Sequence, residues 1–499
     1  MSWDAVVIGA GHNGLVAATC LARGGLRTLL LERRPVLGGA SVTEELWPGY
    51  RVSRAAYVAG LLRPVVVREL GLTARGLRLL PRRPSSFTPL PDGGDLLLGA
   101  GAEADRAAIA RFSQRDAERY PEYEAFLDRT ARMIEPLLDE PPPDPARPRW
   151  RDLSALARLG RAAWRQRRDL PEALGLLLGA ARPALERWFE SEPLRATLAT
   201  DAVIGAWAPP SAPGTGYVLF HHVMGETHGE RGVWAYVKGG MGGLADALAK
   251  AARDAGVEIR PDAEVRRIDV HDGRACGVTL EDGSHVEARR VVSSADPLRT
   301  LRLAGRDAFP ERYARGIEAL DFRSGSLKVN LALDRLPRFR GRDAAGAGAG
   351  PEHHGTIHVG ATDLDAIERA FETAARGGLA ERPIVELTLP SSLDPSLAPP
   401  GHHVASMFVQ WAPCVPADTS WDEARDRLAD TACRLVDEVA PGFSESVLHR
   451  EVLAPPDLER VFGLTGGNIF HGAMSVDRLA FLRPLPGAGG YRTPLDGLW

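Results

Sequence analysis

A glycine-rich turn near the amino terminus separates an apolar strand candidate from a helix candidate. The strand candidate spans residues 5–8, the turn contains Gly9, Gly11 and Gly14, and the helical run spans residues 15–23. In a dinucleotide-binding motif the first glycine allows a tight turn, the second lets the backbone approach a diphosphate, and the third lets the helix pack close to the strand. Amides at the start of such a helix attract negative charge. This order of elements predicts an α/β unit that binds an adenine dinucleotide.

An acidic residue follows the second strand candidate of this unit. Residues 28–31 are apolar apart from Thr28, and Glu32 comes directly after them. A carboxylate at this position can accept hydrogen bonds from both ribose hydroxyls. The alternative is a glycine-rich turn in another kind of α/β protein, but strand, helix, second strand and acid in this order favour the dinucleotide site.

A second glycine pair follows the acid closely. After Arg33 the chain reaches Gly38 and Gly39, which lead into Ala40 and Ser41. Glycines allow a second close approach of the backbone to a ligand. A nicotinamide-binding domain needs no such pair at this position, so the pair favours a flavin dinucleotide.

The motifs together resemble the FAD-binding flavoproteins of the amine oxidase, phytoene desaturase and carotenoid isomerase group. Residues 9–18, Gly-Ala-Gly-His-Asn-Gly-Leu-Val-Ala-Ala, are similar to the branch called pyridine nucleotide-disulphide oxidoreductase domain-containing protein 2. Segments 221–243, 291–297 and 467–472 are similar to the same branch, so the resemblance covers almost the whole chain. It implies FAD as cofactor. The implied cofactor-binding residues are Gly9, Gly11, His12, Asn13, Gly14, Glu32, Arg33, Gly38, Gly39, Ala40, Ser41, Gly240 and Val265.

The positions of these motifs predict two interleaved domains. The expected fold class is α/β, with a Rossmann-like FAD-binding domain of the glutathione-reductase type interrupted by an α+β substrate domain. The FAD-binding domain is assigned residues 1–75, 231–300 and 461–499. The substrate domain is assigned residues 76–230, expected to be helical, and residues 301–460, expected to form a sheet.

The resemblance also implies an element that would follow residue 499. In the resembling branch, residues like 491–499 lead into a final strand, a glycine-rich turn and a helix. We therefore expect this chain to lack the C-terminal FAD-binding element, and the strand at 5–8 to form an exposed apolar sheet edge. Weak FAD binding or aggregation would be the consequence.

Three side chains are catalytic candidates. Residues 327–333 alternate as a strand with Lys328 on one face, and in amine oxidase relatives a lysine near flavin N5 holds a water or stabilises the reduced ring. The alternative places Lys328 on an outer face with its charge in solvent. His222, beside His221 and near Glu226, could move protons, or could pack in a wall. His471 is the best single candidate for a polar group that faces the flavin or the substrate.

Other features of the sequence restrict partners and location. Adjacent histidines do not converge easily on one ion, so no metal site is predicted. Asp296 precedes a proline and is more simply explained as a helix or turn cap. A formal net charge of -4 gives no reason to expect nucleic acid as a partner. The four scattered cysteines include no Cys-x-x-Cys pair and suggest a reducing compartment, so a cytoplasmic location is expected.

Residues 149–168 combine arginines with tryptophans and leucines. This composition suits a basic amphipathic helix on anionic lipid, and peripheral membrane contact is one interpretation. A solvated helix whose apolar stripe packs inward is the favoured alternative.

The resemblance implies an FAD-dependent oxidoreductase that transfers hydride from a substrate C–H bond to flavin N5. Carbon–carbon desaturation of an apolar small molecule is the leading reaction class. Flavin-dependent polyene isomerisation and amine oxidation are alternatives in the same group. A non-catalytic binding or regulatory protein that has lost cofactor affinity is an alternative of another class.

Overall fold

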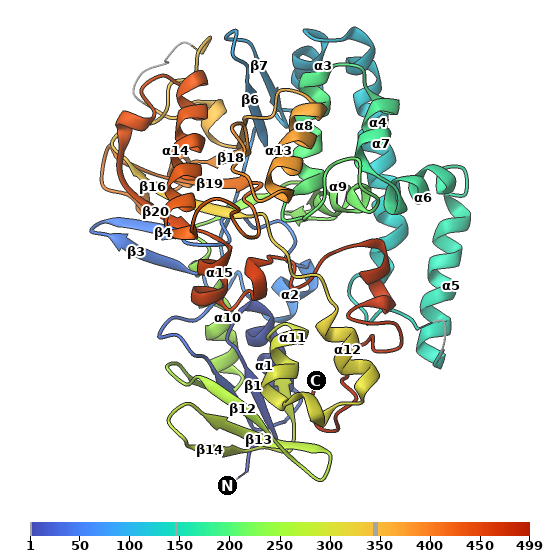
Figure 1. Ribbon diagram of the computed structural model, residues 1–499. Coiled ribbons are helices and arrows are strands. Elements are labelled where there is room, and N and C mark those ends of the chain that lie inside the picture. The colour runs from blue at the N-terminus through green and yellow to red at the C-terminus, as the bar shows by residue number, and fades with distance from the viewer. Residues whose placement is uncertain (1, 145–147, 343–347) are drawn as a thin grey trace.

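The computed structural model describes residues 2–144, 148–342 and 348–499. A small parallel sheet occupies the lower half of Figure 1, and a larger, mostly antiparallel sheet lies at the upper left with a group of helices beside it. The fold is α/β, as the sequence predicts.

The small sheet is built from apolar strands that are covered on both faces. Its order is β11 (Glu258–Arg260), β2 (Thr28–Leu31), β1 (Ala5–Ile8) and β15 (Val291–Ser293), all parallel. Val7 and Leu30 pack on α1 (His12–Arg23) and α10 (Gly242–Asp254). Val6 and Ile8 point to the other face. There they pack on β12 (Val265–His271), β13 (Arg274–Leu280), β14 (His285–Glu287), α11 (Pro297–Ala304) and α12 (Glu311–Glu318). The predicted strands at 5–8 and 28–31 are confirmed.

The expectation that residues 5–8 form an exposed sheet edge is wrong. β1 lies between β2 and β15, and its residues are at most 8% exposed. The edge strand is β15, and residues 497–499 lie along it. The amide of Val291 donates to the Gly497 carbonyl at 2.8 Å, and the amide of Ser293 donates to the Trp499 carbonyl at 2.8 Å. The N-terminal strand is therefore shielded from both sides.

The large sheet has one apolar and one polar face. Its order is β20 (Val447–Leu453), β16 (Leu327–Leu333), β19 (His403–Gln410), β18 (Ile384–Thr388), β17 (Thr356–Val359), β6 (Ser86–Pro89) and β7 (Asp95–Leu98). Leu327, Val329 and Leu331 belong to the apolar core under α14 (Trp421–Val439). Lys328 and Asn330 point the opposite way, as alternation predicts, but they are buried too. β6 and β7 come from the segment that was expected to be helical.

A group of helices packs beside the large sheet around an aromatic-rich core. These helices are α3 (Ala102–Ala110), α4 (Gln114–Ile134), α5 (Trp150–Arg165), α6 (Leu170–Leu178), α7 (Ala181–Trp188), α8 (Glu192–Val203), α9 (Thr215–Val223) and α13 (Leu364–Ala375). In Figure 1, α5 lies at the outer side of this group, away from both sheets.

Several short elements lie outside the two sheets and the helical group. They are β3 (Thr43–Trp47), β4 (Tyr50–Ser53), α2 (Pro64–Glu69), β5 (Leu79–Pro81), β8 (Glu226–Thr227), β9 (Glu230–Arg231), β10 (Ala235–Val237) and α15 (Pro455–Phe462). β10 pairs with β5 in antiparallel fashion, so residues 79–81 and 235–237 lie side by side.

Candidate functional site

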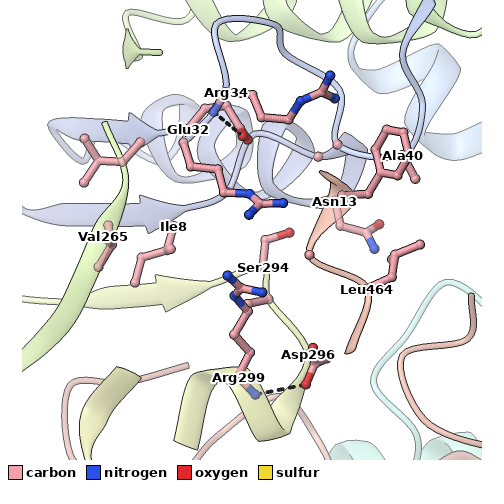
Figure 2. A pocket seen from close by; sticks show the side chains of 18 of the residues that line it. Ile8, Asn13, Glu32, Arg34, Ala40, Val265, Ser294, Asp296, Arg299 and Leu464 are labelled. Carbon is pink, nitrogen blue, oxygen red and sulfur yellow. Dashed lines mark hydrogen bonds between the residues drawn. The ribbon is translucent and has the colours of Figure 1, made fainter. Parts of the chain in front are cut away.

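A cleft opens at the carboxyl ends of β1, β2 and β15, the edge at which open α/β sheets bind their ligands. Figure 2 shows Val265 and Ile8 at one end of the cleft, Ala40 and Leu464 at the other, and Ser294 between them. The lining includes these residues predicted from the sequence: Gly9, Gly11, His12, Asn13, Glu32, Arg33, Gly39, Ala40, Val265 and His471.

The three glycines of the first turn differ in what requires them. Gly9 has a φ of +90°, which favours glycine. A Cβ on Gly14 would overlap the carbonyl oxygen of Gly9, so Gly14 is needed for packing. A Cβ on Gly11 would meet only the Cα of Gly39, at 4.0 Å. The described chain leaves room for a Cβ at position 11, so packing within the protein does not by itself require glycine there.

The second glycine pair lies directly against the first turn. The amide of Gly38 donates to the Ala10 carbonyl at 2.8 Å, and Gly39 has a φ of +59°. A Cβ on Gly39 would come within 3.0 Å of the Gly11 Cα. Gly38 and Ser41 do not line the cleft, but the Ser41 amide closes this loop by donating to the Gly38 carbonyl. The two loops thus form a side-chain-free strip of backbone.

Glu32 is held in place by backbone amides and is 6% exposed. Its Oε2 accepts from the Ala10 amide at 2.8 Å, and its Oε1 accepts from the Arg34 amide at 3.0 Å. Figure 2 shows the second of these bonds. A carboxylate has about four acceptor sites, so both oxygens keep a free lone pair for ribose hydroxyls.

The cleft lining carries the arginines Arg33 and Arg299 beside the carboxylates of Glu32, Glu264 and Asp296. Arg33 donates to the carbonyls of Arg460 and Val461, and burial lowers its pKa, as does nearby Arg299. Arg299 lines the cleft and was missed from the sequence, although it lies within the first turn of a helix whose cap, Asp296, was recognised. α1 begins without a side-chain cap in the described chain. Two guanidinium groups and an uncapped helix start favour an anionic group such as a diphosphate.

His471 and His12 both line the cleft and lie close to each other. Burial lowers the pKa of both imidazoles, and His471 lowers that of His12 further. Both are therefore neutral near pH 7. His471 has a φ of 56°, an uncommon backbone conformation for a residue other than glycine. Asp296 caps α11 as predicted and also accepts from the Thr465 hydroxyl at 2.6 Å, which ties the segment before His471 to the cleft.

Lys328 does not line this cleft and lies on the polar face of the large sheet. It is 2% exposed, so the alternative with its charge in solvent is wrong. Its ammonium group donates to the Ser406 hydroxyl and lies 4.0 Å from the centre of the Tyr57 ring. Burial lowers the pKa of Lys328 to about 7. Ala56, which precedes Tyr57, donates its amide to the Ala40 carbonyl at 3.0 Å, so the segment that packs on Lys328 is also bonded to the cleft lining.

The structure places the remaining predicted residues away from the cleft lining. His222 donates from Nδ1 to the Val218 carbonyl at 3.0 Å and stacks on Trp234. Its neighbour His221 has a buried Nδ1 without a partner among the described residues, and burial lowers its pKa to about 4. Gly240 has a φ of +81°, and a Cβ there would overlap Thr43, which gives this glycine a packing role.

Fold and cleft together define an FAD-binding α/β protein of the glutathione-reductase type. Residues 14–452 match the family described as flavin containing amine oxidoreductase. The chain belongs to this family, and its cofactor is FAD.

Named relatives extend over almost the whole chain. It is 46% identical to the mouse (Mus musculus) pyridine nucleotide-disulfide oxidoreductase domain-containing protein 2, covering 100% of this chain and 89% of the relative. It is 26% identical to the lycopene-forming phytoene desaturase of Pseudescherichia vulneris, covering 96% and 91%. A solved putrescine oxidase variant is similar in fold, with a TM-score of 0.60, 17% identity and coverage of 100% and 92%.

Proposed function

We propose that this oxidoreductase uses FAD to take hydride from a substrate C–H bond, with carbon–carbon desaturation as the leading reaction class. The observation that carries the proposal is the position of Lys328. It is buried on the polar face of the large sheet against Tyr57, and Ala56, next to Tyr57, is hydrogen-bonded to Ala40 of the cofactor cleft. The similarity to a phytoene desaturase supports desaturation, and the family's description as amine oxidoreductase keeps amine oxidation as the alternative.

Residues of the chain would bind and orient FAD and keep the reacting groups from solvent. Gly11, Gly39 and Glu32 would hold the diphosphate and ribose, with Arg33 and Arg299 supplying opposite charge. FAD when bound supplies the hydride acceptor. Lys328, kept from solvent and with a lowered pKa, can hold or accept a proton at Nζ near neutral pH.

Three alternatives differ in what they predict for the flavin. Desaturation of a substrate or oxidation of an amine bleaches the flavin absorbance under anaerobic conditions, whereas polyene isomerisation on reduced flavin is redox-neutral overall. A non-catalytic protein shows no bleaching with any compound. The test is anaerobic mixing of the purified flavoprotein with polyenes, both plain hydrocarbons and polyene carboxylic acids, and with primary amines, followed by absorbance. Bleaching by amines but not by polyenes would contradict the desaturase proposal.

We further propose that α5 and α6 form a membrane-contacting surface. Among the described residues, no helix is both long and apolar enough to cross a membrane. The favoured expectation of inward packing holds for Ala155, but Trp150 is 89% exposed and Trp164 70% exposed. Leu153, Leu174 and Leu178 are exposed on the same two helices, beside exposed arginines that include Arg161 and Arg165. Apolar side chains among cations suit an anionic lipid surface.

Vesicle sedimentation tests this surface. We expect the protein to pellet with vesicles containing phosphatidylserine, and a variant with Trp150→Ser and Trp164→Ser to remain in the supernatant. A control variant with Val415→Ser, which changes an exposed apolar residue far along the chain, should bind as the wild type does. Equal binding of the tryptophan variant would contradict the proposal.

A further inference from the structure

The polar face of the large sheet carries a row of ionisable groups in register. Lys328 on β16 pairs with Phe408 on β19, Phe408 with Glu386 on β18, and Glu386 with His358 on β17. The three ionisable side chains are 2%, 5% and 6% exposed. Neighbouring strands are about 4.8 Å apart, so the row extends roughly 14 Å from Lys328 to His358. A buried sheet face normally carries apolar side chains, so this row requires an explanation.

Arg82 lies at the end of this row and is a buried cation without an ionic partner among the described residues. It is 5% exposed, and its Nη1 donates to the Thr356 hydroxyl at the start of β17, at 2.7 Å. Its guanidinium carbon lies 5.5 Å from the centre of the Tyr236 ring. Its Nε has no hydrogen-bond partner, and no carboxylate of the described residues lies within ion-pair distance of it. Buried charges are almost always paired, so a guanidinium in this state lacks a partner.

The groups around Arg82 are mostly hydrogen-bond donors. Tyr236 is 1% exposed; its hydroxyl lies near Arg82 and Thr388 but makes no hydrogen bond within 3.5 Å to a described residue. Tyr57 donates to Glu386 at 3.3 Å. Burial raises the pKa of Glu386 to about 8, with Asp201 on α8 adding to the effect, so this carboxyl is mainly protonated at pH 7. Burial lowers the pKa of His358 to about 4, so its imidazole is neutral.

We propose that Arg82 and Tyr236 bind a carboxylate group of the substrate. The guanidinium and the phenol donate to the two carboxylate oxygens, and the rest of the substrate extends past the Tyr57 ring, which covers Lys328 and Phe408 and bonds to Glu386. This inference rests on the proposed function and narrows it. The substrate is a carboxylic acid whose oxidised carbon lies several bonds from its acid group, and it is not a plain hydrocarbon. A carboxylate supplies the bidentate acceptor that Arg82 lacks.

Binding of a matched set of small molecules tests the proposal. The probes are octanoate, octanamide and octylamine, titrated into the FAD-loaded protein and followed both by flavin absorbance and by calorimetry. The wild type should bind octanoate at least about tenfold more tightly than octanamide. Arg82→Met should remove this preference. Arg83→Met is the matched control, because Arg83 is the next residue, is half exposed and pairs with Glu230 on the surface.

A second variant keeps the test decisive if Arg82→Met fails to fold. Tyr236→Phe removes only the hydroxyl and should weaken octanoate binding by roughly threefold to tenfold. The proposal is overturned if octanoate binds no more tightly than octanamide, or if Arg82→Met and Tyr236→Phe both bind octanoate as the wild type does. Failure of the proposed function would give a different result from failure of this carboxylate site. The flavin would be absent or never bleached, while calorimetry would still report whether octanoate binds.

Discussion

Replacing Glu386 by glutamine should change how stability depends on pH. Burial raises the pKa of Glu386 from 4.5 to about 8, so the folded protein holds a proton that the unfolded chain has lost. The stabilisation that Glu386 provides is complete below about pH 4.5 and is lost as pH rises through about 8. Between these values, one proton corresponds to about 1.4 kcal/mol per pH unit. From about pH 5.5 to about pH 7.5 the wild type should lose roughly 2–3 kcal/mol relative to Glu386→Gln.

The measurement is the free energy of unfolding of both proteins by denaturant, at saturating FAD, at several pH values in this range. Other titrating groups, such as His358 with its lowered pKa, occur in both proteins and largely cancel in the difference. Infrared spectra provide an independent check, because the wild type should show a protonated-carboxyl band near pH 6 that Glu386→Gln lacks. A difference in stability that stays constant with pH, together with no such band, would refute the argument that Glu386 is buried and protonated.

Two further variants probe the cofactor side of the site. Lys328→Met should lower the rate of flavin bleaching by roughly a hundredfold and should remove the rise in rate through about pH 7, since Nζ must be neutral to accept a proton. Stopped-flow measurement of the bleaching rate across pH tests this, and the surface variant Lys250→Met should behave as the wild type. An unchanged pH profile in Lys328→Met would contradict the proton-accepting role of Lys328. Asp296→Ala removes two helix-cap hydrogen bonds and the bond from the Thr465 hydroxyl, and should lower the free energy of unfolding by about 1–3 kcal/mol. Thr465→Val removes only the bond from the Thr465 hydroxyl and should lower it by less. Equal losses in the two variants would show that the Asp296 cap of α11 contributes nothing to stability.

Local patterns in the sequence predicted the elements that hold the cofactor. Strands at 5–8 and 28–31, the helix that follows Gly14, and the strand at 327–333 all form, because each depends on neighbours a few residues away. Asp296 was recognised as a cap for the same reason. The role of Gly11 also followed from the motif, and the open space around its missing Cβ supports it.

Features that depend on distant parts of the chain were not predictable in this way. Arg82 and Glu386 belong to the same buried cluster, yet about 300 residues separate them. The burial of Lys328 depends on Tyr57, which packs over its ammonium group. The predicted sheet edge at 5–8 was wrong because the strand at 291–293 pairs beside it. Alternation in a single strand gives the face of a side chain, but only the fold decides what covers that face.

The most direct test of the account is whether Gly11 is required for FAD and for nothing else. The measurement is the amount of FAD bound to purified Gly11→Val, identified by mass spectrometry and quantified by absorbance, with melting temperatures recorded in the absence of FAD. Gly160→Ala, at an open position on α5, is the control. We predict that Gly11→Val melts as the wild type does without FAD but binds FAD at least about a hundredfold more weakly, because its side chain occupies the space of the diphosphate. Full FAD occupancy in Gly11→Val would contradict the assignment of this cleft as the cofactor site.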